Sequence, residues 1–227
     1  MNCAILQPSY IPWRGYFHQI QKADVFVFYD DVQFDKHGWR NRNRIKTSNG
    51  PVWLTIPVAS RGNVIHHTPI NTIEIVWDKP WNEKHWATLR QAYAKAPYFA
   101  RYAPLLESFY GQRPTHLADF TIALTIALAN AIGLTPTFLR SSELGIPGGR
   151  TDRLVAILTK LGARHYISGP SAANYLEEDK LAAAGITLEY MAYDYPEYPQ
   201  LYPPYDPNVT ILDLLFMCGP DAPTAIW

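Results

Sequence analysis

Short apolar segments alternate with helical patterns at both ends of this chain, and this alternation constrains its fold most strongly. Near the start, CAILQ, GYFHQIQKA and DVFVFYD (residues 3–7, 15–23 and 24–30) read as a strand, a helix and a strand. Residues 137–193 repeat the alternation near the end. Such a succession is typical of α/β proteins. The sequence therefore predicts an open α/β sheet with a Rossmann-like βαβ unit at its amino-terminal end.

The middle of the chain departs from this alternation. Residues 39–46, 52–58 and 72–77 read as strands without helices between them, and they predict an antiparallel block. From residue 80 to residue 133 the pattern is helical, and its apolar run at residues 120–134 is too short to span a bilayer. We expect one α/β domain over residues 1–227, in which the helical insertion at about 80–133 is a candidate cap.

Charge and cysteine content exclude several classes of protein. The chain has 20 basic and 20 acidic side chains, so no net field attracts it to nucleic acid or to an anionic membrane. Cys3 and Cys218 lie at opposite ends, and no H-E-x-x-H or H-x-D spacing occurs, so we expect no disulfide framework and no metal site. Because the first residues lack the basic and apolar regions of a signal peptide, we expect a cytoplasmic protein.

The opening loop, LQPSYIPWRGYF, lies between the first predicted strand and the first predicted helix. A glycine at such a turn, Gly15, lets a ligand approach the backbone, and the helix that follows presents free N–H groups. Open α/β sheets bind their ligands at the carboxyl ends of the strands, and this loop follows the carboxyl end of the first predicted strand. Alternatively, Trp13 and Phe17 only anchor the loop to the core. The candidate ligand-binding residues here are Gln7, Tyr10, Trp13, Gly15 and Tyr16.

Two aspartates, Asp30 and Asp31, end the second predicted strand. Adjacent strand residues face opposite ways, so both carboxylates share a site only if the chain turns there. Three roles remain open for them. One is a general base toward an amine, another is a ligand of a divalent cation that bridges phosphates, and the third is a hydrogen-bonded turn.

The segment KHGWRNRNRIK carries the clearest charge pattern. Read as a strand, it places Arg40, Arg42, Arg44 and Lys46 on one face, and Trp39, Asn41, Asn43 and Ile45 on the other. The arginines suit phosphate or carboxylate, and the asparagines beside a tryptophan suit sugar hydroxyls. A charged edge strand that resists aggregation is the alternative. Four cations without a nearby acid favour an anion site.

Two later loops precede predicted helices and are candidate phosphate cradles. In IPGGRTDRL, two glycines and Arg150 come before a helix whose N-cap is expected at Thr151 or Asp152, with Arg153 in its first turn. In YISGPSAANYL, the corresponding residues are Ser168, Gly169 and Ser171. Neither loop has P-loop spacing, and both compositions also suit ordinary turns.

The segment at residues 192–207 interleaves tyrosines with prolines, which prevent a helix or a central strand. The sequence predicts an extended strap. Its tyrosines either cover apolar surface or form an aromatic wall beside a ligand site.

Several blocks together resemble the WbqC-like family, which is known from O-antigen and other surface-polysaccharide gene clusters. These blocks, which span nearly the whole chain, are LQPSYIPWRGYF, DDVQFxKxGWxNRNxI, WLTIPV, TDRL, YISGxSxAxYL, YPQ and ILDLLFxxG. Gln33 and Lys36 of the second block are further candidate ligand-binding residues. The resemblance implies transfer of glycine or a related acyl group to an amino sugar.

The opening block alone is also similar to nucleotidylyltransferases and pantothenate synthetase, in which an H-x-G-H motif binds ATP phosphates. The matching stretch here is Trp13-Arg14-Gly15-Tyr16, so both histidines of the motif are missing. Arg14 and His18 are the remaining candidates to contact phosphate. This similarity supports the fold, and the chemistry of adenylyl transfer is not carried over with it.

These features predict an enzyme of surface-polysaccharide precursor synthesis that acylates a small-molecule substrate, an amino sugar linked to a nucleotide. Asp30 or Asp31 would take the amine proton, and His18 is the next candidate base. ATP with magnesium and a free amino acid, or an acyl thioester, would each serve as donor. The alternatives are a non-catalytic nucleotide-sugar or glycan-binding module and an ATP-dependent ligase of the nucleotidyl-transfer type. The sequence leaves a homo-oligomer open.

Overall fold

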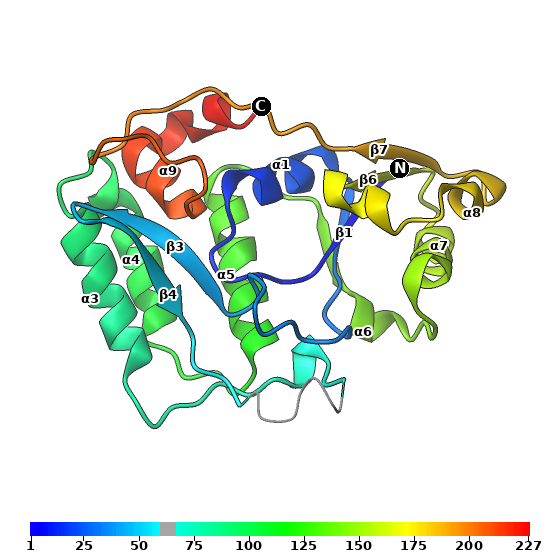
Figure 1. Cartoon of the computed structure of the whole chain (residues 1–227), viewed down its shortest axis with the longest axis horizontal. Coiled ribbons are helices and arrows are strands. Elements are labelled where there is room, and N and C mark those ends of the chain that lie inside the picture. Colours follow the sequence, from blue (N-terminus) through cyan, green and yellow to red (C-terminus); the bar gives the residue numbers. More distant parts are fainter. Residues whose placement is uncertain (60–66) are drawn as a thin grey trace.

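Five short strands of the computed structural model, which describes residues 1–59 and 67–227, form a parallel sheet (Figure 1). Their order is β5-β2-β1-β6-β7, and each neighbouring pair is parallel. The chain leaves β1 toward β2 and β5, and later crosses back to place β6 and β7 on the other side of β1. This confirms the predicted α/β fold and makes the gap between β1 and β6 a topological switch point. The strands are β1 (Asn2–Leu6), β2 (Val25–Phe28), β5 (Thr137–Arg140), β6 (His165–Ser168) and β7 (Thr187–Tyr190).

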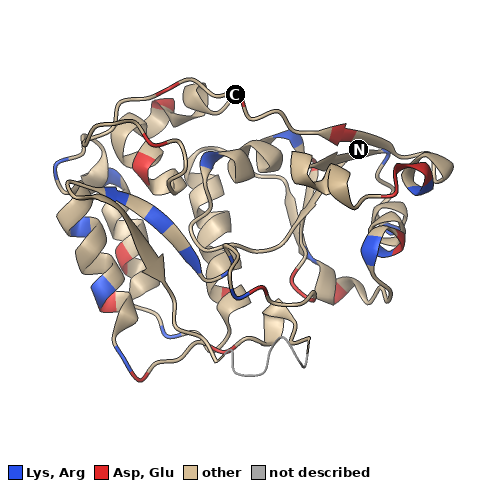
Figure 2. Ribbon diagram, viewed as in Figure 1, with Lys and Arg blue, Asp and Glu red and all other residues tan. Residues whose placement is uncertain are grey.

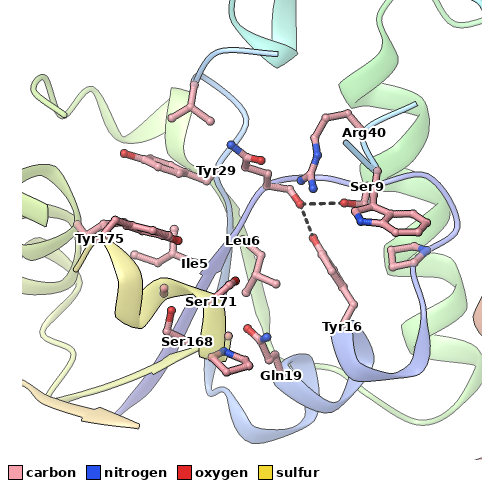
Figure 3. Close-up of a pocket in the computed structure, with 18 of the residues that line it drawn as sticks. Ile5, Leu6, Ser9, Tyr16, Gln19, Tyr29, Arg40, Ser168, Ser171 and Tyr175 are labelled. Carbon is pink, nitrogen blue, oxygen red and sulfur yellow. Dashed lines mark hydrogen bonds between the residues drawn. The ribbon is translucent and has the colours of Figure 1, made fainter. Parts of the chain in front are cut away.

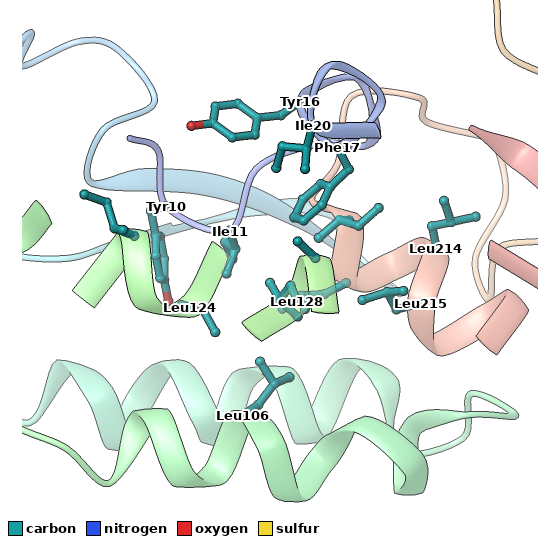
Figure 4. Close-up of a cluster of buried hydrophobic side chains, with 14 of the residues drawn as sticks. Tyr10, Ile11, Tyr16, Phe17, Ile20, Leu106, Leu124, Leu128, Leu214 and Leu215 are labelled. Carbon is teal, nitrogen blue, oxygen red and sulfur yellow. The ribbon is translucent and has the colours of Figure 1, made fainter. Parts of the chain in front are cut away.

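Helices cover both faces of this sheet. Successive side chains of each strand point to opposite faces, so each face carries apolar side chains that pack into a core of its own. Val25 and Val27 of β2 face the core that contains residues of α7 (Arg150–Leu161) and α8 (Glu178–Ala183). Phe26 and Phe28 face the larger core, part of which is drawn in Figure 4. That core takes residues from α1 (Arg14–Lys22), α3 (Trp81–Tyr93), α4 (Phe99–Tyr110), α5 (Leu117–Ala131) and α9 (Ile211–Cys218).

The predicted antiparallel block is a hairpin of two strands, β3 (Arg42–Thr47) and β4 (Gly50–Thr55). It lies with α3 and α4 at the opposite end of the molecule from α7 and α8 (Figure 1). The third strand predicted at residues 72–77 is wrong. Glu74 pairs with His116 and Ile75 pairs with Val58, so neighbouring residues bridge to different segments and no ladder forms. Burial of Ile73 and Ile75 explains the strand-like alternation.

The helical predictions hold with shifted bounds. Residues 170–183 contain a 3₁₀ turn (Pro170–Asn174) followed by α8, where the sequence suggested one helix. The helix α7 begins at Arg150 with Gly149 as its N-cap, and not at Thr151 or Asp152. Helix α6 (Ser141–Leu144) and two further 3₁₀ turns (Ile70–Thr72 and Gly219–Ala225) complete the elements of the described residues.

The segment at residues 192–207, which we call the tyrosine strap, has no helix or strand, bends at residues 201–204 and links β7 to α9. It packs on the start of α1. Arg14 donates hydrogen bonds to the carbonyl oxygens of Pro196 and Ala225 at 2.8 and 2.9 Å, and to the hydroxyl of Tyr205 at 2.8 Å. Its guanidinium also lies 4.7 Å from the ring centre of Tyr195. Arg14 therefore holds the strap against the core.

Tyr10 turns away from the sheet edge and joins a buried polar cluster in the larger core. Its hydroxyl lies 2.9 Å from Nδ1 of His85 and 2.5 Å from the hydroxyl of Tyr110. Burial lowers the pKa of His85 from 6.5 to about 4. His85 is therefore neutral in the folded protein at neutral pH.

We expect this histidine to make folding sensitive to acid. The unfolded chain binds a proton at His85 below about pH 6.5, whereas the folded chain binds it only below about pH 4. The stability that is fully present above pH 6.5 should therefore decrease by roughly 3 kcal/mol as the pH falls through this window. Urea unfolding of wild type and His85→Gln between pH 7 and pH 4 measures the difference. The exposed His37→Gln is the control, and parallel curves for wild type and His85→Gln would contradict the expectation.

Candidate functional site

A pocket of about 950 Å³ lies at the carboxyl ends of β1, β2 and β6, at the switch point of the sheet. Gln7 follows β1, Tyr29 follows β2, and Ser168 ends β6, so three neighbouring strands each deliver a polar side chain to one edge. Parallel strands bring their carboxyl ends together, which is why residues far apart in sequence meet here. Figure 3 shows Tyr29 and Ser168 among the side chains around the cavity.

The remaining walls come from loops. Pro12 and Trp13 precede α1, Trp39 and Arg40 precede β3, and Gly148 to Arg150 lead into α7. Tyr16 of α1 donates a hydrogen bond of 3.2 Å to the Gln7 carbonyl oxygen and thereby ties the helix to the end of β1 (Figure 3). Arg150 has a φ of 53°, a left-handed backbone that a residue other than glycine rarely adopts.

Most candidate residues from the sequence line this pocket. They are Gln7, Trp13, Tyr16, Asp31, Gln33, Trp39, Arg40, Asn43, Arg150, Arg153, Ser168, Gly169 and Ser171.

Seven other candidates, and Asp30 as described below, do not line the pocket, and six of the seven have clear structural contacts. Arg14 binds the tyrosine strap, Tyr10 joins the His85 cluster, and Asn41 donates to the Ile56 carbonyl oxygen at 2.8 Å. At Gly15, a β-carbon would lie 2.3 Å from the ring of Trp13, so glycine is required for Trp13 to fold over the helix start. The last three are His18, whose Nδ1 lies 2.9 Å from the Tyr195 hydroxyl, the exposed Lys36, and Arg42, which bonds to the His37 carbonyl oxygen at 2.6 Å.

The paired aspartates differ in burial, although both lie within hydrogen-bond distance of the Ser141 hydroxyl, Asp30 at 3.2 Å and Asp31 at 2.5 Å. Asp30 is fully buried, and its carboxylate accepts hydrogen bonds from the backbone N–H of Ser142 at 3.0 Å and from the Ser142 hydroxyl at 2.9 Å. This contact joins the end of β2 to the start of α6. Asp31 points into the pocket instead. Asp30 therefore has the structural role and Asp31 is the carboxylate that a ligand can reach.

Asp31 is held by neighbours on both oxygens. One oxygen forms an ion pair with Arg153, and the other accepts a hydrogen bond of 2.5 Å from the Ser141 hydroxyl. Arg153 is itself fixed by the Ile146 carbonyl oxygen at 2.9 Å, and it lies over the ring of Tyr29 at 5.1 Å. Burial raises the pKa of Tyr29 despite this guanidinium, so its phenol is a poor base at neutral pH.

Positive charge dominates the pocket. Arg40, Arg44, Arg150 and Arg153 line it, whereas Asp31 is its one acidic side chain among the residues that the structure describes. Arg153 is committed to Asp31, and Arg44 lies 3.7 Å from Asp206. Figure 2 shows the basic residues along β3, and Arg44 of this strand lines the pocket. Burial lowers the pKa of Arg40, yet a guanidinium remains charged at neutral pH. The surplus charge favours an anionic ligand.

The strand pattern predicted for residues 39–46 holds only in part. Arg44 reaches the pocket, but Lys46 is buried and bonds to Gln200 of the tyrosine strap at 2.5 Å. Trp39 and Trp53 are both exposed, and their rings stack with centres 5.4 Å apart at the edge of the hairpin.

Sequence reasoning missed several lining residues, among them Gln19, Tyr29 and Tyr175. The signals for two of them were present. Gln19 lies three residues after Tyr16 on the same helix face, and Tyr29 directly follows β2. Tyr175 lies in an irregular segment between the 3₁₀ turn and α8, and no periodicity marks it.

Within residues 1–59 and 67–227, no helix is both long and apolar enough to cross a membrane. The same residues hold no group of three or more His, Cys, Asp or Glu side chains placed to share a metal ion.

Comparison with known proteins gives one family and one relative. A model of the WbqC-like protein family matches residues 7–225. An uncharacterized protein of Mycobacterium tuberculosis (strain ATCC 25618 / H37Rv), Rv1507c, is 38% identical over 222 residues, which is 97% of this chain and 95% of that protein. No solved structure matches.

Proposed function

The chain belongs to the WbqC-like protein family, and on that premise we propose that it is a biosynthetic enzyme that acylates the amino group of an amino sugar carried on a nucleotide. The observation that supports this most is the pocket at the switch point, which is lined by four arginines and, among the described residues, one carboxylate. The arginines suit a diphosphate, and the carboxylate suits the proton that an amine releases.

In the proposed reaction, the uncharged amine nitrogen attacks the carbonyl carbon of the acyl donor. The new C–N bond forms, the bond to a thiolate or phosphate leaving group breaks, and Asp31 takes the amine proton. Ser141 and Arg153 orient the Asp31 carboxylate for this role. Either an acyl thioester or an amino acid activated by ATP with magnesium would supply the acyl group.

The test of this function is an activity screen. Purified protein is incubated with UDP- and dTDP-linked amino sugars, and with either acyl thioesters or amino acids plus ATP and magnesium. Mass spectrometry then detects the acylated sugar. We expect one donor class to give product, and a protein that binds these nucleotides without acylating any of them would contradict the proposal.

A second candidate is a non-catalytic binding module for nucleotide sugars or glycans. One observation favours it: Asp31 is already paired with Arg153, so its carboxylate has a structural partner before any substrate arrives. The ligase alternative has less support, because Arg14 of the Trp13-Arg14-Gly15-Tyr16 stretch bonds to the strap.

We expect the phosphates of the ligand to contact Arg40 and Arg150. Replacing either residue by alanine should weaken binding of the nucleotide sugar by about 10- to 100-fold, because a charge-assisted hydrogen bond contributes about 1.5 to 3 kcal/mol. Isothermal titration calorimetry measures this loss. Arg90→Ala, an exposed arginine of α3 outside the pocket, is the matched control. Unchanged affinity in both pocket variants would contradict the anion site.

A further inference from the structure

A buried amide at the pocket wall has one atom without a hydrogen-bond partner. Gln19 of α1 is 2% exposed and lines the pocket. Its Nε2 donates to the Tyr193 hydroxyl, whereas its Oε1 is buried and has no partner among the described residues. Figure 3 shows the side chain directed from α1 toward the cavity, on the side of Ser168. A buried carbonyl oxygen is rarely left unpaired, so this one is an acceptor in the pocket wall that lacks its donor.

The contacts around Gln19 fix its direction. Tyr193 belongs to the tyrosine strap and packs edge-on against Trp13, with ring centres 4.9 Å apart. A β-carbon at Gly169 would lie 3.6 Å from Nε2 of Gln19 and 3.4 Å from the Tyr193 hydroxyl. The tyrosine strap, the opening loop and the residue after β6 therefore fix the position of the Gln19 side-chain amide.

The chemistry on this side of the pocket differs from that on the arginine side. Gln19, Ser168 and Ser171 are uncharged and offer hydroxyl and amide groups. Figure 3 shows Arg40 on the opposite side of the cavity from Ser168. An unpaired acceptor oxygen repels phosphate and attracts O–H and N–H donors. A ligand that carries both phosphates and hydroxyl groups therefore fits the pocket in one orientation, with its phosphates toward Arg40 and its hydroxyl groups toward Gln19.

We propose that Gln19 is a specificity-determining residue whose Oε1 accepts a hydrogen bond from a hydroxyl or amino group of the sugar, with Ser168 beside it. This inference rests on the proposed function and extends it, because it assigns the sugar to the Gln19 side of the pocket and the phosphates to the Arg40 side. It concerns recognition and is independent of whether acylation follows.

The test compares binding of UDP- and dTDP-linked amino sugars with binding of UDP and dTDP alone. Gln19→Leu removes the acceptor, so we expect it to lose at least about 10-fold in affinity for the nucleotide sugars and to bind the free nucleotides as wild type does. Gln19→Glu keeps an acceptor oxygen and should restore sugar binding. Gln21→Leu, an exposed glutamine on the same helix, is the matched control. Thermal unfolding of each variant shows whether it is folded.

The outcomes separate this inference from the proposed function. If Gln19→Leu loses affinity equally for sugar nucleotides and free nucleotides, or for neither, Gln19 has only a structural role and the inference is overturned. A wild-type protein that binds the sugar nucleotides no more tightly than the free nucleotides, or binds none of them, also overturns it. Selective loss in Gln19→Leu without acylation in any assay supports the sugar subsite and contradicts the enzymatic function.

Discussion

Replacing Asp31 by asparagine is expected to reduce turnover by roughly 100- to 10,000-fold, the usual effect of removing a positioned general base. The amide keeps the shape of the side chain and still accepts the Ser141 hydrogen bond, but it cannot take a proton from the amine. Ligand affinity should stay within a few fold. Steady-state kinetics with the donor and sugar found in the activity screen, together with calorimetric binding, measure the two quantities separately.

Asp30→Asn is the paired control, because the two aspartates are adjacent but have different surroundings. Asp30 is fully buried and bonds to Ser142, so its replacement should lower the free energy of unfolding and leave kcat of the folded protein largely unchanged. Full activity in both variants would show that the base lies elsewhere. Loss of kcat in Asp30→Asn alone would reverse the assignment.

Replacing Arg14 by alanine is expected to lower the free energy of unfolding by about 3 to 5 kcal/mol. The change leaves the buried carbonyl oxygen of Ala225, and the part-buried Pro196 carbonyl oxygen and Tyr205 hydroxyl, without their donor; an unsatisfied buried group costs about 1 to 3 kcal/mol, and a part-buried one costs less. It also removes the guanidinium from the ring of Tyr195. Urea unfolding curves give the stability, with the exposed Arg101→Ala as control.

Arg14→Lys refines this prediction. A lysine keeps the charge but lacks the planar fork that reaches three acceptors, so its stability should fall between wild type and Arg14→Ala. A loss below 1 kcal/mol for Arg14→Ala would mean that the tyrosine strap does not depend on this contact. In that case the strap must be held mainly by its tyrosine rings.

The sequence alone determined the α/β class and most of the elements, because strand and helix periodicity depend on local burial patterns. It also predicted one pocket residue at or after the end of each of β1, β2 and β6, since the carboxyl ends of parallel strands meet at one edge. Asp31, Ser168 and Gln7 reach the pocket for that reason. The residues 72–77 misled the same reasoning, because an alternating burial pattern also arises where a segment bridges two different neighbours.

Tertiary structure alone decided which polar residues on and before α1 line the pocket. Arg14, Tyr10 and Gln19 all lie on or near α1, yet Arg14 contacts Pro196 and Tyr10 contacts His85 and Tyr110. Only Gln19 lines the pocket. These partners come from segments 75 to 182 residues later in the chain. Local sequence determines the helix and the face on which each side chain lies. Whether that face becomes core, strap contact or pocket wall depends on which distant segments pack against it.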